Sequence, residues 1–151
     1  DWDEDGLTDI VAQDHEGYLA MYKGRRDGYF APGERVFKGE DGNPLRLNDG
    51  EGGKSGRAKF QLVDWDKDGD LDLLRNTELT GWFENVEGVY TWRGDFPGRK
   101  LAGHTTAPVA FDWNEDGHLD LFIGAEDGHI YCYHRAAFEE PDKITARPYS
   151  E

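Results

Sequence analysis

Short apolar runs recur along the chain, each bounded by turn residues such as Asp, Asn and Gly. Runs of this kind are typical of β-strands, and no helical periodicity follows the loops between them. Two stretches, residues 1–22 and 112–133, align without a gap, which indicates a repeated unit. The pattern therefore predicts an all-β chain, with strands at residues 9–12, 18–22, 35–37, 59–63, 72–75, 82–85, 89–92, 106–111, 120–123 and 129–133.

A nine-residue acidic loop lies before one strand of each unit, at residues 1–9, 64–72 and 112–120. In every copy, positions one, three, five and nine carry a carboxylate or an amide, and these groups can converge on one hard cation. Glycine at position six permits a sharp turn. Position seven varies freely, as expected where only its backbone carbonyl serves as a ligand. The loops therefore predict calcium sites.

Other interpretations of the loops explain less. Acidic, solvated turns would account for one copy, since Asp-Gly is a common turn pair, but not for three copies that each precede an apolar run. An EF-hand requires a bidentate acid at position twelve, where this chain has Ala12, Arg75 and Ile123. The same three residues argue against a dockerin-type calcium repeat. A calcium loop of another kind is therefore favoured.

Composition supports this interpretation and excludes several classes of partner. The net charge of −15 comes mostly from the loops, because eleven of their twelve side-chain positions are aspartate, with Asn114 the exception. Such an acidic chain is a poor partner for nucleic acid or an anionic membrane, and no apolar run approaches the roughly 20 residues of a spanning helix. Cys132 is the single cysteine and has no internal disulfide partner. Calcium sites of modest affinity favour an extracellular or periplasmic setting, where the ion is abundant.

At the loops and their following strands, the chain resembles the FG-GAP or VCBS repeat family of calcium-binding β-propellers, most typically at residues 71–74 and 119–124. The resemblance implies blades of four antiparallel strands, with a structural Ca²⁺ loop between the first and second strand of each blade. It implies up to three ions. The implied ligands, including the position-seven residues that offer a carbonyl, are Asp1, Asp3, Asp5, Leu7, Asp9, Asp64, Asp66, Asp68, Asp70, Asp72, Asp112, Asn114, Asp116, His118 and Asp120.

Three repeats are expected, at about residues 1–37, 59–92 and 106–134, with a long inter-blade loop at 38–58 and an irregular tail at 135–151. Three blades are fewer than the four to eight that close a propeller, so we expect the remaining blades to lie outside this chain. A small β-sandwich is the alternative fold. Trp2, Trp65 and Trp113, at position two of each loop, are expected to pack between blades.

The resemblance leaves the function open between two classes. The first is a secreted, calcium-stabilised propeller segment that binds a polysaccharide or an extracellular protein, for which Trp82, Trp92, Arg57 and Lys54 are the candidate ligand-binding residues, because aromatic rings stack on sugars and cations pair with carboxylates. The second is part of a polysaccharide lyase or another glycan-active enzyme acting on acidic polysaccharide. Its candidate catalytic residues are His104 and Tyr90 for proton removal and Arg99 for charge stabilisation.

Overall fold

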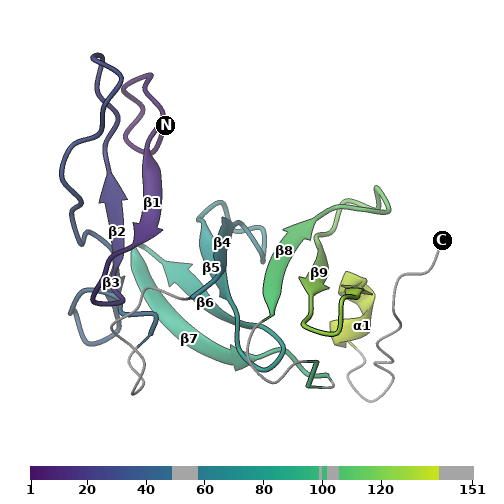
Figure 1. Cartoon of the computed structure of the whole chain (residues 1–151). Helices are drawn as coiled ribbons and strands as arrows, with labels where there is room; N and C mark the ends of the chain where they lie inside the picture. The colour runs from purple at the N-terminus through teal and green to yellow at the C-terminus, as the bar shows by residue number, and fades with distance from the viewer. Residues whose placement is uncertain (49–57, 99, 102–105, 140–151) are drawn as a thin grey trace. The chain divides into compact units, whose positions relative to one another are not determined.

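The computed structural model describes residues 1–48, 58–98, 100–101 and 106–139, and in this part of the chain every regular element except one is a β-strand (Figure 1). The fold is all-β, and each sheet is open. The elements are β1 (Ile10–Gln13), β2 (Leu19–Tyr22), β3 (Lys38–Gly39), β4 (Phe60–Val63), β5 (Asp72–Arg75), β6 (Gly81–Val86), β7 (Val89–Asp95), β8 (Ala107–Phe111), β9 (Asp120–Gly124), β10 (Ile130–Tyr133) and α1 (Arg135–Glu139).

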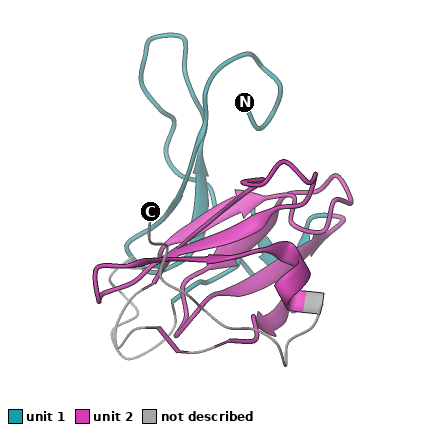
Figure 2. Cartoon of the chain, turned by 90° about the vertical axis from the view of Figure 1, so that its right-hand side faces the viewer, with its two compact units in different colours: residues 1–58, 88–90 teal, residues 59–87, 91–151 magenta. Residues whose placement is uncertain are grey.

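The chain divides into two compact units, coloured separately in Figure 2: residues 1–58 with 88–90, and residues 59–87 with 91–151. In the first unit, β1 and β2 form an antiparallel hairpin in which Ile10 pairs with Tyr22. β3 pairs in parallel with Val89 and Tyr90, the first residues of β7. Leu19 and Leu47 are fully buried in this unit.

The strand expected at residues 35–37 does not form. The chain makes a single antiparallel bridge between Met21 and Glu34, and the Val36 amide then donates to the Glu34 carbonyl at 3.0 Å. The Val36 amide is used within this local turn and cannot donate a hydrogen bond to β2. The antiparallel pairing with β2 therefore ends at Glu34. The neighbouring apolar side chain, Phe37, is buried all the same, at 3% exposed.

The second unit contains two antiparallel sheets. The first follows the predicted order of the repeat, namely strand, acidic loop, strand, hairpin, strand and strand, with β4 beside β5, β5 beside β6, and β6 beside β7. The second sheet has the order β10-β9-β8. A core forms between them from the buried residues Trp65, Leu74, Leu79, Phe96, Ala110, Leu121, Ile123 and Tyr133.

The sequence pattern predicts irregular structure from residue 135, whereas the structure has a one-turn helix there, α1. Its segment Arg-Ala-Ala-Phe-Glu consists mostly of good helix formers. Phe138 anchors the turn, with its ring centroid 5.9 Å from that of Trp65 and 4.9 Å from that of Phe96. Burial of that ring supplies the stability that one isolated helical turn lacks. Residues 140–151 lie outside the described part. No described helix is long and apolar enough to cross a membrane.

Candidate metal centres

The three acidic loops share one backbone conformation. Position six, always glycine, has φ of 84°, 100° and 85° in the first, second and third loops, and a Cβ there would meet no atom within 4 Å. The left-handed backbone, and not a lack of space, therefore favours glycine at position six. Position four is also left-handed, although it is never glycine, with φ of 59°, 67° and 59° for Glu4, Lys67 and Glu115. The same strained turn is thus built three times.

Backbone amides of each loop hold its carboxylates. The position-six amide donates to the position-one carboxylate at 3.1, 3.2 and 2.9 Å in the first, second and third loops. The position-seven amide donates to the position-five carboxylate at 2.8, 2.9 and 2.8 Å. Each of these bonds occupies one carboxylate oxygen, and a second oxygen of the same group can serve another ligand, except at Asp116, where it accepts the Asn114 side-chain amide.

The position-nine aspartate joins the loop to the following hairpin. One of its oxygens accepts the position-two amide, at 2.8 Å for Asp9, 2.9 Å for Asp72 and 3.3 Å for Asp120. The other accepts an amide from near the end of the hairpin's second strand: Asn85 lies within β6, and Gly24 and Arg135 lie just beyond β2 and β10. The position-nine carboxylate therefore links the start of its loop to the second strand of the following hairpin. Asp72 and Asp120 are fully buried.

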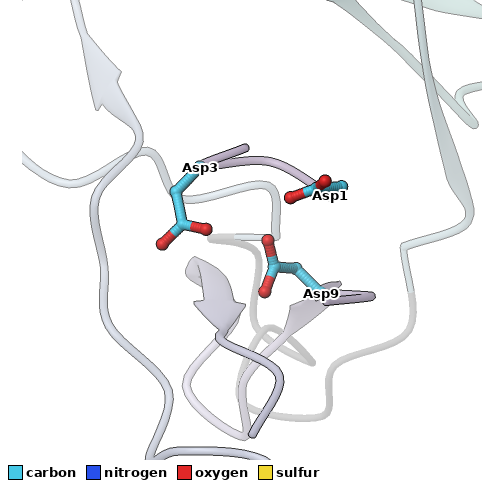
Figure 3. Close-up of side chains that lie close together, drawn as sticks. All are labelled: Asp1, Asp3 and Asp9. Carbon is cyan, nitrogen blue, oxygen red and sulfur yellow. The ribbon is translucent and has the colours of Figure 1, made fainter. Parts of the chain in front are cut away.

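In two loops the carboxylates converge. Oxygens of Asp1, Asp3 and Asp9 all lie within 4.8 Å of one another, as do oxygens of Asp64, Asp66 and Asp72, and Figure 3 shows the first group facing a common centre. Hard oxygen donors at this spacing are the ligands that Ca²⁺ prefers. The structure thus brings positions one, three and nine together, as the sequence predicts.

A buried oxygen without a hydrogen-bond partner provides an independent test of whether a cation fits. Among the described residues, Asp64 Oδ1 and Asp112 Oδ1 are buried and have no hydrogen-bond partner. Both belong to position one, whose other oxygen accepts the position-six amide. An unpaired buried carboxylate oxygen is costly, and coordination of a cation would remove that cost. The donor set of the loops therefore fits Ca²⁺.

Electrostatics of the second loop lead to the same conclusion. Burial raises the pKa of Asp72 to about 6, although hydrogen bonds from the Asn85 and Trp65 amides act in the opposite direction. Burial, followed by the charge of Asp68, also raises the pKa of Asp66. Both shifts reflect a negative charge that the surrounding protein does not neutralise, as expected where a divalent ion would supply the missing positive charge.

The remaining predicted ligands are not all brought together. Asp5 and Asp68 lie outside the two groups of converging acids, with one oxygen of each on the position-seven amide. The described residues of the third loop form no such acidic triple, because position three is Asn114 and its amide nitrogen donates to Asp116 at 2.9 Å. At position seven, the Leu7 side chain is partly buried, whereas those of Asp70 and His118 are exposed.

The position-two tryptophans differ in burial. Trp65 is 3% exposed and packs between the two sheets of its unit, as predicted, with the Arg135 guanidinium 4.3 Å above its ring centroid. Trp2 is 38% exposed with its ring on Phe37, and Trp113 is 50% exposed. Of the three, Trp65 alone packs between two described sheets, and packing between blades stays a prediction for Trp2 and Trp113.

The uncovered face around Trp113 is extensive. Strands β8 to β10 present a hollow of about 380 Å³ lined by Ala107, Val109, Phe111, Trp113, Phe122, Gly124 and Ile130. By strand register, Phe111 and Phe122 correspond to Val63 and Leu74 of the preceding repeat. In that repeat the corresponding face packs on the β8–β9–β10 sheet, and Gln61 donates to the Ala110 carbonyl at 3.1 Å. The face of β8–β10 therefore has the composition of a sheet interface.

The two predicted stacking residues do not form one platform. Trp82 lies in the core with its ring parallel to Phe96, 6.4 Å between centroids, whereas Trp92 packs on Phe83 at 4.8 Å. Residues 82 and 83 are neighbours in β6 and so point to opposite faces of the sheet. Trp92 is 41% exposed, with the Arg75 guanidinium 5.8 Å from its ring centroid. Arg57 and Lys54 lie outside the described residues.

The candidate catalytic residues are not assembled either. Tyr90 is 3% exposed and packs edge-on against Phe37, 5.9 Å between ring centroids. Its ring therefore has little surface at which a substrate could reach it. His104 and Arg99 lie outside the described residues.

The sequence analysis missed residues outside the loops that contact loop residues. Gly24 is one of them, because its amide donates to Asp9. A Cβ at this position would lie 2.5 Å from the Thr8 carbonyl oxygen, so only glycine fits. The gapless match of residues 1–22 to 112–133 could have indicated Lys23 and His134 as equivalent positions immediately beyond the second strand. The pairing register adds Glu84 as the equivalent residue of the middle repeat.

These features define a class: an all-β protein built from sequence repeats, each of which carries one acidic, glycine-containing loop. Residues 1–75, which include the first two loops, match the family model of the FG-GAP-like repeat. This match confirms, over residues 1–75, the FG-GAP resemblance inferred from the sequence. The searches of curated proteins and of solved structures found no significant match.

Proposed function

We propose that the three loops bind Ca²⁺ and that the ions stabilise a β-propeller segment. The observation that carries this proposal is the pair of buried, unpartnered oxygens, Asp64 Oδ1 and Asp112 Oδ1, at the same position of two loops. The loops place several carboxylates at each site, which leaves little of a calcium coordination shell for a substrate. The ion would therefore have a structural role, neutralising carboxylates that the fold forces together.

Thermal unfolding with excess chelator, with Ca²⁺ and with Mg²⁺ tests the proposal. A site that is filled at ten times its dissociation constant adds about 1.4 kcal/mol of stability. Chelation should therefore lower the melting temperature, Ca²⁺ should restore it, and Mg²⁺ should do so poorly because it requires a more rigid shell. Asp64→Asn combined with Asp112→Asn should reduce the calcium effect, whereas Asp127→Asn, outside the loops, should retain it. A melt that Ca²⁺ and chelator leave unchanged would refute the proposal.

The open face of β8–β10 supports membership of a larger propeller. The corresponding face of the preceding repeat is covered by the next sheet of the same kind, as described above. We infer that another repeat sheet covers the face around Phe111 and Trp113, so that these aromatic residues become part of a core. Hydrogen exchange of β8 to β10 would be slower in a longer protein that contains the neighbouring repeat, and equal rates would contradict the inference.

As the biological role of this segment, we propose binding of a polysaccharide or an extracellular protein by a secreted protein. The end of the β1–β2 hairpin supports it, since the Arg35 and Arg46 guanidinium groups lie 4.1 and 5.4 Å from the ring centroid of Tyr18. Cations beside an aromatic ring suit an acidic sugar, although Arg35 also pairs with Asp14 and Glu16. Burial of Tyr90 favours this role over a polysaccharide lyase.

Incubation with uronic-acid polysaccharides distinguishes the two roles. Retention on a glycan affinity gel, weakened by Arg46→Met and accompanied by no new absorbance from an unsaturated sugar, is the result expected for a binding module. Appearance of that absorbance would instead support the lyase. Absence of both signals would leave an extracellular protein as the partner to be sought.

A further inference from the structure

The three loops differ in the charge of one bordering residue. Strand pairing places Ile10 opposite Tyr22, Leu73 opposite Phe83, and Leu121 opposite Tyr133. The antiparallel register, continued by one residue, places a different side chain opposite each position-nine aspartate. These residues are Lys23 in the first repeat, Glu84 in the second and His134 in the third.

Lys23 directly contacts one of the acids that converge in the first loop. Its Nζ lies 2.8 Å from Asp3 Oδ2, and the two side chains are 45% and 29% exposed. Asp3 is a member of the triple with Asp1 and Asp9 whose oxygens lie within 4.8 Å of one another. The ammonium group therefore lies at the edge of the place where a divalent cation would sit.

The second loop has an acid in the equivalent place. Glu84 adds its negative charge beside Asp66, and it also pairs with Arg93. Asp64, Asp66 and Asp72 thus converge without a bordering lysine on the opposing strand. The residue opposite position nine is consequently a cation paired with a loop acid in the first repeat, and an acid paired with Arg93 in the second.

We propose that Lys23 acts as a built-in competitor of Ca²⁺ and makes the first loop bind the ion more weakly than the second. The residue opposite position nine thereby sets the order in which these two loops fill. This inference rests on the proposed binding of Ca²⁺ by the loops. Binding at the first loop requires the ammonium to give up its ion pair with Asp3, and the displaced ammonium still lies close to a doubly charged ion.

The size of the effect follows from two contributions. Because the ion pair between Lys23 and Asp3 is exposed, breaking it weakens binding by at most a few-fold. Repulsion between the displaced ammonium and a nearby divalent ion weakens binding further, by a factor that salt reduces through screening. Together they correspond to an affinity for Ca²⁺ at the first loop that is about tenfold weaker, or somewhat more, than it would be without the charge.

Calcium titration of the decalcified chain tests this inference by isothermal calorimetry, with a competing chelator to resolve the tighter sites. Lys23→Met keeps most of the side-chain stem and removes the charge, while Lys23→Glu copies the second repeat. Glu84→Lys makes the reciprocal change. Lys100→Met is the matched control, because Lys100 is similarly exposed, at 55%, and pairs with Glu78 away from the loops.

Lys23→Met should tighten one calcium site, that of the first loop, about tenfold, and Lys23→Glu should tighten it further. Glu84→Lys should weaken a tight site, and Lys100→Met should change no constant by more than about twofold. Three calcium sites whose constants do not respond to Lys23→Met or Lys23→Glu would overturn the inference while leaving calcium binding intact. Absence of any calcium heat in the unmodified chain would instead refute the proposed function itself.

Discussion

Substitution of the loop glycine provides a sharp test of the metal-site geometry, and the third repeat contains its own control. Gly117 at position six of the loop and Gly128 in the following hairpin turn both have φ of 85°. At neither position would a Cβ meet an atom within 4 Å. Alanine at either position therefore introduces backbone strain of the same kind without a steric clash.

The magnitude follows from the backbone. A left-handed conformation costs an L-residue about 1–2 kcal/mol, so Gly128→Ala should lower the free energy of unfolding by about this amount in excess chelator, and Gly117→Ala by less because its loop can relax without the ion. Only Gly117 donates its amide to a loop carboxylate, that of Asp112, at 2.9 Å. In Gly117→Ala, relaxation of φ at residue 117 would move its amide away from Asp112 and distort the loop. The loop would have to return to the strained conformation to bind the ion. Gly117→Ala should therefore weaken Ca²⁺ binding at the third loop about 5–30-fold.

Urea denaturation followed by tryptophan fluorescence measures the free energy of unfolding, and calorimetric titration measures the calcium affinity. Gly128→Ala should bind Ca²⁺ as the unmodified chain does, despite its lower stability. The reasoning is refuted if Gly117→Ala is as destabilised as Gly128→Ala and yet keeps full affinity for Ca²⁺. It is also refuted if neither substitution changes the urea midpoint, since the left-handed turns would then not be strained for alanine.

Three further outcomes are expected. Leu121→Ala, at a fully buried position, should lower the free energy of unfolding by about 2–5 kcal/mol in urea denaturation, and a loss below 1 kcal/mol would contradict the core between the two sheets. Because burial raises the pKa of Cys132 to about 11, the thiol stays protonated at neutral pH, so alkylation by iodoacetamide should accelerate only above about pH 10; a midpoint at the ordinary value of 9.0 would argue against its burial. Trp113→Ser should reduce fluorescence of a bound hydrophobic dye relative to the unmodified chain, and an unchanged signal would locate the exposed apolar surface elsewhere.

The strands next to the loops could be predicted from the sequence because local chemistry determines them. Residues 72–75 form β5 as expected, since an aspartate that closes the loop immediately precedes three β-forming positions. The convergence of positions one, three and nine was equally predictable, because it follows from the spacing of oxygen ligands around a tight turn.

Features that depend on tertiary contacts were not predictable. Residues 35–37 have a suitable pattern for a strand, but pairing with β2 ends at Glu34. The three loop tryptophans differ in exposure, because only Trp65 lies in the core between two described sheets. The role of Lys23 becomes visible only when the strand register places it beside Asp3.

The aromatic face of β8–β10 has a practical consequence for work with this chain in isolation. Arrays of repeats usually remain soluble because their terminal units carry a polar outer surface, whereas this face presents Phe111 and Trp113 to solvent. Mutual repulsion between chains of net charge −15 delays their association, and added salt screens that repulsion. Purification at low ionic strength, or polar replacements at these two positions that imitate a terminal cap, should therefore keep the isolated chain monomeric.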